Sequence, residues 1–229
     1  HLKAHEYDLI FSRVPPNDLA RVCAKYADQA GIPFVADVND LWPEAMRMVF
    51  DVPPISTISF SGFKRDADYV YQHAAAVIGT SDEYAQRALA SGASPELLTV
   101  YVGNNVAEFD AEVAAAPIQK PEGEFWVTYA GSLGTSYDIE SLIQAGNMLK
   151  EMGHTDIRIM ILGEGPERER LEEIARTLDV DATFFGYLPH AQMAPYLAAS
   201  DILVNSFVRK APQSIVSKVG DYLAAAKPM

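Results

Sequence analysis

The chain has 229 residues, of which 49% are hydrophobic and 21% are charged, a composition typical of folded proteins that excludes a disordered chain. Its 31 acidic and 18 basic residues give a formal net charge of −13, which disfavours nucleic-acid binding as the main task. At about 150 residues per domain, the length fits one large domain or two small ones.

The cysteine content and the lack of long apolar runs indicate a cytoplasmic protein. The single cysteine, Cys23, cannot form an internal disulfide. No apolar run reaches the roughly 18 residues that cross a bilayer, and the first residues (HLKAHEYD) lack the hydrophobic core of a signal peptide. Because the chain has no initiator methionine and stops just after a helix-like stretch, we expect a fragment of something longer.

The first half of the chain predicts strands that alternate with helices. Apolar runs predict strands at 7–12, 33–38, 75–79 and 97–102, and helical spacing predicts helices at 15–31, 63–73 and 81–92. Gly31 is the expected end of the first helix, and Ser81 is the expected N-cap of the third. The stretch between 39 and 62 is weakly patterned and interrupted by prolines.

The same alternation continues after a predicted domain boundary at 107–123, which has two prolines and no strong period. Beyond it, we expect strands at 125–130, 156–162, 182–185 and 201–204, and helices at 138–152, 166–178, 189–199 and 215–225. Apolar strands between amphipathic helices favour parallel sheets covered on both faces. The predicted fold class is therefore α/β, with two doubly wound Rossmann-like domains, both truncated, at 1–112 and 124–229, joined by a linker at 113–123.

In such sheets the ligand binds beyond the carboxyl ends of the strands, so the chemistry is expected in the loops that follow them. The loop Gly131–Gly134 follows a strand and precedes a helix, so its N–H groups can face an anion; a tight turn without a ligand is an equal alternative. Gly163-Glu164-Gly165 lacks the third glycine of a dinucleotide fingerprint, since Arg168 stands there. An NAD site is therefore weakly indicated.

Two further loops are rich in polar groups. After the last strand, Lys218 adds a cation close to a helix start and Asp221 lies one turn beyond it, which suits a sugar diphosphate, although an exposed ion pair between the two is more common. After the strand at 33–38, Asn39, Asp40 and Glu44 surround an indole, and a simple turn is the alternative. The five histidines never occur at metal-ligand spacing, so no metal is expected.

Taken in order, these loops resemble the family 4 retaining glycosyltransferases of GT-B fold, especially the bacterial surface-polysaccharide type. The resemblance covers nearly the whole chain. Its motifs are 37–44 (DVNDLWPE), 76–81 (AVIGTS), 104–106 (NNV), 129–134 (YAGSLG), 161–165 (ILGEG), 185–188 (FGYL), 199–201 (ASD) and 221–228 (DYLAAAKP).

The resemblance implies that the second domain binds a nucleotide-diphosphate sugar and that the first holds a glycan or lipid-linked acceptor. Sugar transfer would serve cell-surface polysaccharide synthesis, retain the anomeric configuration and need neither a metal nor a cofactor. The implied catalytic residues, which would face the cleft, are Asn39, Asp40 and Glu44. The implied donor-binding residues are Gly131, Ser132 and Gly134 at the diphosphate, Tyr187 and Leu188 at the base, and Gln213, Ser214, Ile215, Val216, Lys218 and Asp221 around the sugar, phosphates and ribose.

The sequence departs from the family pattern at several of these positions. The family's E-x7-E pair reads Gln213-x7-Asp221, and its basic residues after the glycine loop are Ser132 and Tyr137. Lys218, with Arg209 or Lys210, would then have to neutralise the diphosphate. The family's histidine before the aspartate is Asn39.

Three matters stay open at this point. A nucleotide-sugar epimerase of the same fold and a non-catalytic sugar-nucleotide-binding subunit are the alternative functions. A lipid-linked acceptor would bring peripheral contact with the inner face of the membrane. The sequence predicts no oligomeric state, donor sugar or base.

Overall fold

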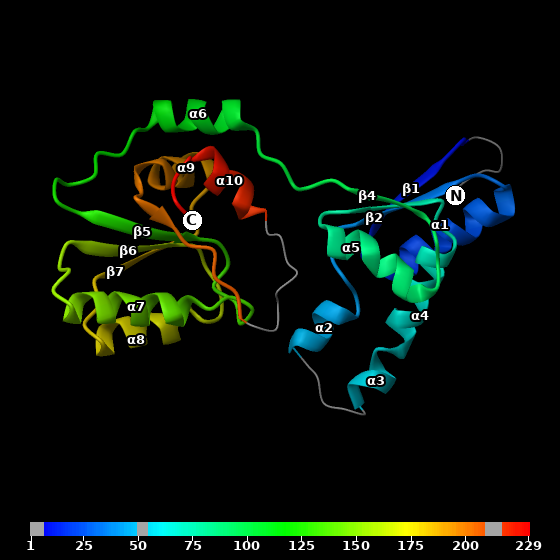
Figure 1. The fold of residues 1–229 in the computed structure, drawn as a ribbon, viewed down its shortest axis with the longest axis horizontal. Helices are drawn as coiled ribbons and strands as arrows, with labels where there is room; N and C mark the ends of the chain where they lie inside the picture. Colours follow the sequence, from blue (N-terminus) through cyan, green and yellow to red (C-terminus); the bar gives the residue numbers. More distant parts are fainter. Residues whose placement is uncertain (1–6, 50–54, 209–216) are drawn as a thin grey trace. The chain divides into compact units, whose positions relative to one another are not determined.

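The computed structural model describes residues 7–49, 55–208 and 217–229. Within these ranges, residues 7–102 form one compact unit, and 103–208 with 217–229 form a second. Each unit is built on one parallel four-stranded sheet with helices packed against it (Figure 1). Across the described ranges, no helix has the length and apolar character needed to cross a membrane.

The first unit follows the predicted alternation of strands and helices. Its sheet has the order β1-β2-β3-β4, and all neighbours are parallel. Gly31 ends the first helix in the left-handed conformation, and the Ser81 hydroxyl accepts a hydrogen bond from the Tyr84 N–H, so both predicted caps are confirmed. The elements are β1 (Ile10–Val14), α1 (Asn17–Ala30), β2 (Phe34–Val38), α2 (Glu44–Val49), α3 (Ile55–Ser59), α4 (Ser61–Gln72), β3 (Ala76–Gly79), α5 (Asp82–Gln86), the 3-10 helix η1 (Arg87–Ser91) and β4 (Glu96–Thr99).

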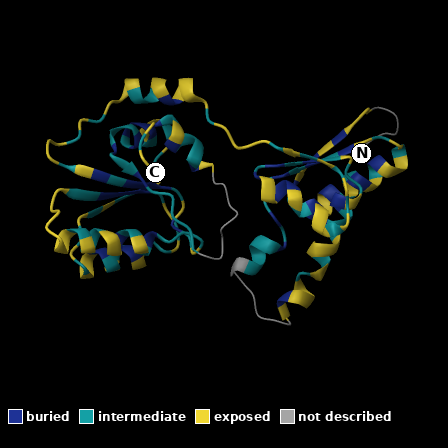
Figure 2. Ribbon diagram, in the orientation of Figure 1, coloured by how far each residue is buried: buried dark blue, intermediate teal, exposed yellow. Residues whose placement is uncertain are grey.

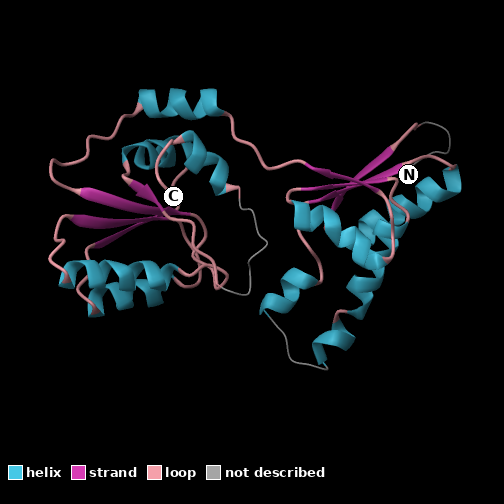
Figure 3. Cartoon of the chain, in the orientation of Figure 1, coloured by secondary structure: helices cyan, strands magenta, loops and turns pink. Residues whose placement is uncertain are grey.

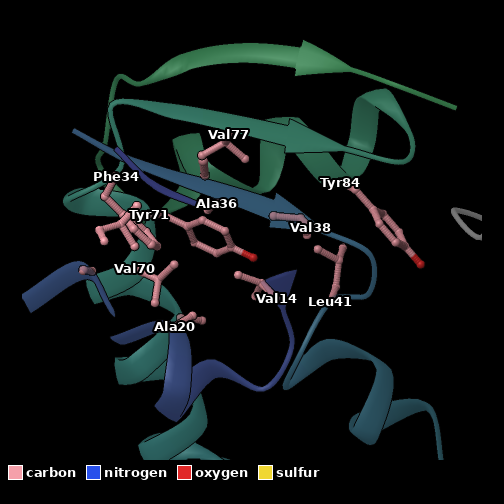
Figure 4. Close-up of a cluster of buried hydrophobic side chains, with 14 of the residues drawn as sticks. Val14, Ala20, Phe34, Ala36, Val38, Leu41, Val70, Tyr71, Val77 and Tyr84 are labelled. Carbon is pink, nitrogen blue, oxygen red and sulfur yellow. The ribbon is translucent and has the colours of Figure 1, made fainter. Parts of the chain in front are cut away.

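One face of the first sheet forms the core of this unit. Alternate side chains of β1 and β2, such as Val14 and Phe34, pack against α1 and α4, where Ala20 and Tyr71 are buried (Figure 4). Burying a side chain of this size contributes about 1.5–3 kcal/mol. On the other face, Phe11 is 57% exposed.

The second unit contains the predicted strand and helix pattern with one added helix. Its sheet has the order β7-β6-β5-β8, again fully parallel. Helices α7 and α8 lie on one face of the sheet, and α9 and α10 lie on the other (Figure 3). The elements are α6 (Val106–Ala115), β5 (Phe125–Ala130), α7 (Ile139–Glu151), β6 (Ile157–Leu162), α8 (Arg168–Thr177), β7 (Ala182–Gly186), α9 (His190–Ala199), β8 (Ile202–Leu203) and α10 (Lys218–Ala224).

Because of the added helix, α6, the observed boundary between the units differs from the predicted one. We predicted that the first domain ends at 112, whereas the compact units divide after Val102. The reason is Phe109, which is 1% exposed in the core of the second unit and fixes α6 there. Asn105 caps the start of α6, because its side-chain oxygen accepts from Glu108 N–H and its amide donates to the Glu108 carboxylate. The predicted linker at 113–123 therefore begins within a helix.

The core of the second unit covers both faces of its sheet, and its central strands are largely dark in the burial view (Figure 2). Tyr129 and Ile161 pack toward α7 and α8. On the opposite face, Phe109 and Tyr222 pack with side chains of α9. The doubly covered sheet leaves only its strand ends and loops for a ligand.

Two glycine-containing loops pack backbone to backbone at the ends of β5 and β6. Gly131 N–H donates to the Leu162 carbonyl at 2.9 Å, and Leu133 N–H donates to the Glu164 carbonyl at 2.9 Å. A Cβ on Gly163 would lie 1.8 Å from the Gly131 carbonyl oxygen, at a φ of +149°. The glycines of the loop after β6, Gly163 and Gly165, therefore permit this close approach. Their presence needs no dinucleotide-binding role.

We predict that Gly163→Ala lowers the free energy of unfolding by at least about 2 kcal/mol, because the new methyl group must displace the neighbouring backbone. The matched control is Gly134→Ala in the adjoining loop, where an added Cβ would meet nothing within 4 Å and should cost less than about 0.5 kcal/mol. Urea unfolding of the two variants measures the difference. Equal stability of Gly163→Ala and the parent would contradict the close packing of the loops.

Candidate functional site

The strand order of the second sheet reverses between β5 and β8. The chain runs from β5 outward to β6 and β7 and then returns to the other side of β5 as β8. Ligands of doubly wound sheets bind at such reversals, beyond the carboxyl ends of the strands. The Tyr222 hydroxyl of α10 joins the two strand ends: it accepts from Ala130 N–H at 2.8 Å and donates to the Val204 carbonyl at 3.1 Å.

Lys218, the first residue of α10, places its ammonium group near this reversal. Its Nζ lies 4.0 Å from the centre of the Tyr129 ring, 4.3 Å from that of Tyr137 and 5.9 Å from that of Phe207. A Cβ on Gly131 would lie 3.1 Å from the same Nζ. The lysine therefore lies beneath the start of the glycine loop, within an aromatic cage.

Within the described ranges this ammonium group has no anionic partner. Lys218 is 8% exposed, and its Nζ has no hydrogen-bond partner among the described residues. The ion pair with Asp221 that we held as the commoner outcome is not formed. Burial lowers the pKa of Lys218 to about 7, although the ring faces favour its charge. A buried cation without a counter-charge costs stability, which a bound anion would recover.

The glycine loop offers two backbone donors to an anion. The N–H groups of Gly131 and Leu133 are used by the carbonyls of Leu162 and Glu164. Neither Ser132 nor Gly134 donates its N–H to another described residue. Our expectation that the whole loop can face an anion therefore narrows to these two N–H groups.

Beside the loop lies a hollow of about 250 Å³. It brings together four residues that we had assigned to the donor, and Tyr187 is 75% exposed at its edge. Apolar side chains of β6 and α9 complete it. The lining comprises Gly131, Ser132, Leu162, Gly163, Glu164, Tyr187, Leu188 and Met193.

Asp221 does not line this hollow. Its Oδ1 accepts from the Asn104 amide at 2.8 Å and lies 2.9 Å from His190 Nε2. The other ring nitrogen of His190 lies 2.5 Å from Glu112 Oε2. Our sequence analysis considered the histidines only as metal ligands and missed this cluster, because its members are 31 and 78 residues apart in the chain.

The three candidate residues of the first unit lie together after β2, and each has a partner. Asn39 accepts from Arg13 at 3.2 Å. Asp40 accepts from the Trp42 indole N–H at 3.2 Å. Glu44 accepts from Arg87 Nε at 2.6 Å, and the Arg87 side chain is only 10% exposed. Burial opposes the charge of Arg87, but Glu44 raises its pKa above the usual value.

Several predicted residues fall outside the described ranges, namely Arg209, Lys210, Gln213, Ser214, Ile215 and Val216. Within those ranges, no cluster of three or more His, Cys, Asp or Glu side chains could hold a metal ion.

A family model covers most of the second unit. Residues 110–209 match the model described as glycosyl transferases group 1, which is less than half of the chain. No protein of curated function matches the sequence.

Solved structures share the fold of both units. HepE of Anabaena in complex with UDP has a TM-score of 0.74 and 18% identity, over 98% of this chain and 59% of HepE. The α,α-trehalose 6-phosphate synthase of Burkholderia multivorans has a TM-score of 0.64 and 12% identity, over 93% of this chain and 60% of the synthase.

The lipopolysaccharide outer core galactosyltransferase WaaB has a TM-score of 0.57 and 14% identity, over 95% of this chain and 55% of WaaB. This chain therefore spans less than two thirds of the length of these three proteins. At these identities the likeness shows the fold, and the predicted fold class of two Rossmann-like domains of GT-B type is confirmed.

We predict that Lys218→Met stabilises the chain by on the order of a few kcal/mol at pH 6. Burial lowers the pKa of Lys218 to about 7, so the penalty for its charge is full below that pH and disappears as the pH rises to the unfolded-state value near 10.4. The gain should therefore shrink between pH 7 and 10. Denaturant unfolding at several pH values measures it.

The matched control is Lys150→Met, because Lys150 is a partly exposed lysine of the same unit that pairs with Asp179. Its effect should be small and nearly independent of pH. If Lys218→Met destabilised the chain at pH 6 as much as at pH 10, the ammonium would not be an uncompensated buried charge.

We predict that Glu44→Gln lowers the stability of the first unit by about 1–2 kcal/mol, since the largely buried Arg87 loses a charged partner and keeps only Asp68. Glu96→Gln removes an exposed carboxylate of the same unit and should change it by less than about 0.5 kcal/mol. Thermal and urea unfolding compare the two. Equal effects would show that the Arg87 pair adds no stability.

Proposed function

We propose that the protein is a retaining glycosyltransferase that moves a sugar from a nucleotide-diphosphate donor to a glycan or lipid-linked acceptor. The observation that carries the proposal is Lys218, a buried ammonium without a counter-charge at the reversal point of the second sheet. The match of residues 110–209 to group 1 glycosyl transferases supports it.

In this proposal Lys218 neutralises the donor diphosphate in place of the basic residues that the family carries after its glycine loop. One of those family positions is Tyr137, and the Lys218 Nζ lies 4.3 Å from the centre of its ring. The charge would therefore come from α10 to the region where the family supplies it from the loop between β5 and α7. The free N–H groups of Ser132 and Gly134 would bind the same phosphates.

The hollow beside the loop suits the nucleoside. The exposed ring of Tyr187 would stack on the base, and Leu188 would contact its edge. UDP-sugars are the first donors to test, because HepE was solved with UDP and with UDP and glucose. Asp221 keeps its proposed role at the ribose through its second carboxylate oxygen, since Oδ1 is already bound by Asn104 and His190.

In the proposed sugar transfer, the protein must stabilise the charge that develops on the leaving diphosphate. As the bond from the sugar to the phosphate breaks, negative charge grows on the phosphate, and Lys218 and the two N–H groups stabilise it. The acceptor hydroxyl oxygen bonds to the anomeric carbon on the face that the phosphate leaves, and its proton passes to that phosphate, so the configuration is retained. Because Lys218 and the N–H groups stabilise the charge on the phosphate, no metal is needed. Asn39, Asp40 and Glu44 are the proposed residues on the acceptor side.

The proposed setting is the synthesis of cell-surface polysaccharide at the cytoplasmic face of the membrane. It is supported by the fold shared with the lipopolysaccharide galactosyltransferase WaaB. The order of the motifs along the chain, especially 37–44, agrees with the bacterial surface-polysaccharide type.

We predict that UDP-glucose binds more weakly as the pH rises above about 7, by up to tenfold per pH unit, because binding must then bring a proton to Lys218. The diphosphate of UDP-glucose keeps its charge over this range, so the pH dependence arises from groups of the protein, and Lys218 carries the main part of it. Lys218→Met should weaken binding about 10- to 100-fold at pH 6 and remove that main part. Isothermal titration calorimetry between pH 6 and 8.5 measures both.

Lys150→Met is again the control and should leave the affinity unchanged. A thermal-shift comparison of UDP-, GDP- and ADP-sugars identifies the base. Product analysis on the whole protein, with and without acceptor, separates transfer from epimerisation and from binding alone. If none of the sugar nucleotides bound, or if Lys218→Met bound them as tightly as the parent, the proposal would fail.

A further inference from the structure

His190 lies between carboxylates from two other helices. It is the first residue of α9. Its Nδ1 lies 2.5 Å from Glu112 Oε2 on α6, and its Nε2 lies 2.9 Å from Asp221 Oδ1 on α10. The Asn104 amide donates to the same Asp221 oxygen at 2.8 Å. Three helices of the second unit thus meet at one imidazole.

This geometry favours the imidazolium form of His190. A neutral imidazole has one N–H and would turn a lone pair toward the second carboxylate, whereas the imidazolium donates to both. The hydrogen bond to Asp221 raises the pKa of His190 and that to Glu112 raises it further, against the opposing effect of burial. The edge of the group faces the Phe109 ring, whose centre is 6.2 Å away. The titratable groups that contact the ring are Glu112 from α6 and Asp221 from α10.

Among the described residues, two sets of side-chain hydrogen bonds attach α10 to the rest of the unit, and the cluster is one of them. Tyr222 fixes the helix to the ends of β5 and β8. His190 and Asn104 fix it through Asp221, and a Cβ on Gly220 would lie 3.1 Å from the Asn104 Cβ. Lys218 stands one turn before Asp221 on this seven-residue helix, so its position under Gly131 depends on both attachments.

We infer that His190, as an imidazolium, is a positioning residue: it joins α6 to α10, keeps Lys218 beneath the glycine loop and orients Asp221. The inference rests on the proposed function where it concerns sugar-nucleotide affinity. His190 does not touch the donor. Its charge determines how well α10 positions Lys218 and Asp221, which are the residues proposed to bind the donor.

Three measurements that compare the parent with His190→Gln test the inference. The control is His154→Gln, since His154 is an exposed histidine of the same unit. First, nitrogen NMR of the parent should show both His190 ring nitrogens protonated at pH 6. Second, hydrogen exchange of the α10 amides should be faster in His190→Gln than in the parent at pH 6. Third, UDP-glucose should bind His190→Gln about 3- to 10-fold more weakly at pH 6, and this ratio should approach 1 as His190 deprotonates at higher pH.

Glu112→Gln removes one carboxylate and should move the midpoint of the ratio to lower pH, which a merely structural histidine would not produce. A singly protonated His190 at pH 6, unchanged α10 exchange, or a ratio that is constant with pH would overturn the inference. If the parent failed to bind UDP-glucose, the proposed function would fail, while the NMR and exchange results would still decide the role of His190.

Discussion

The central constraint on the second unit is a buried charge that has no counter-charge among the described residues. Lys218 is buried against three aromatic rings, and its ammonium has no hydrogen-bond partner in the part of the chain that the structure describes. The folded state bears the cost of desolvating that charge. A chain selected only for stability would place an apolar side chain there, and proteins commonly accept such a cost where a ligand must be bound. The unbalanced charge is therefore the strongest indication of an anionic ligand.

The rest of the unit serves to hold this lysine and the glycine loop in register. Gly163 lets the loop after β6 contact the backbone of Gly131 and fix the loop above the lysine. Below the glycine loop, the Tyr222 hydroxyl links the ends of β5 and β8. His190 links Asp221 of α10 to Glu112 of α6. The overall negative charge of the chain does not exclude a phosphate site, because a local cation and aimed N–H groups decide the field there.

Much of the fold could be predicted from the sequence, because apolar strands and long amphipathic helices such as α1, α7 and α8 have strong periods. Helix α6 was missed because Phe109 is its one buried residue, although the N-cap Asn105 marks its start. The glycine loop was predictable because it is local in sequence. The cage of Lys218 and the cluster at His190 were not, since their members come together only when distant segments pack. The sequence placed Lys218 at the site but indicated neither its burial nor its lack of a partner.

The most direct test of the central claim is the protonation of the Lys218 side chain itself, followed by NMR of lysine-labelled protein in the absence and presence of UDP-glucose. Burial lowers the pKa of Lys218 to about 7 in the free chain. On binding, a phosphate beside the ammonium should move its titration midpoint to roughly 9 or above. A midpoint that stays near 7 in the saturated complex would show that the ligand does not supply the missing counter-charge, and the account would be contradicted.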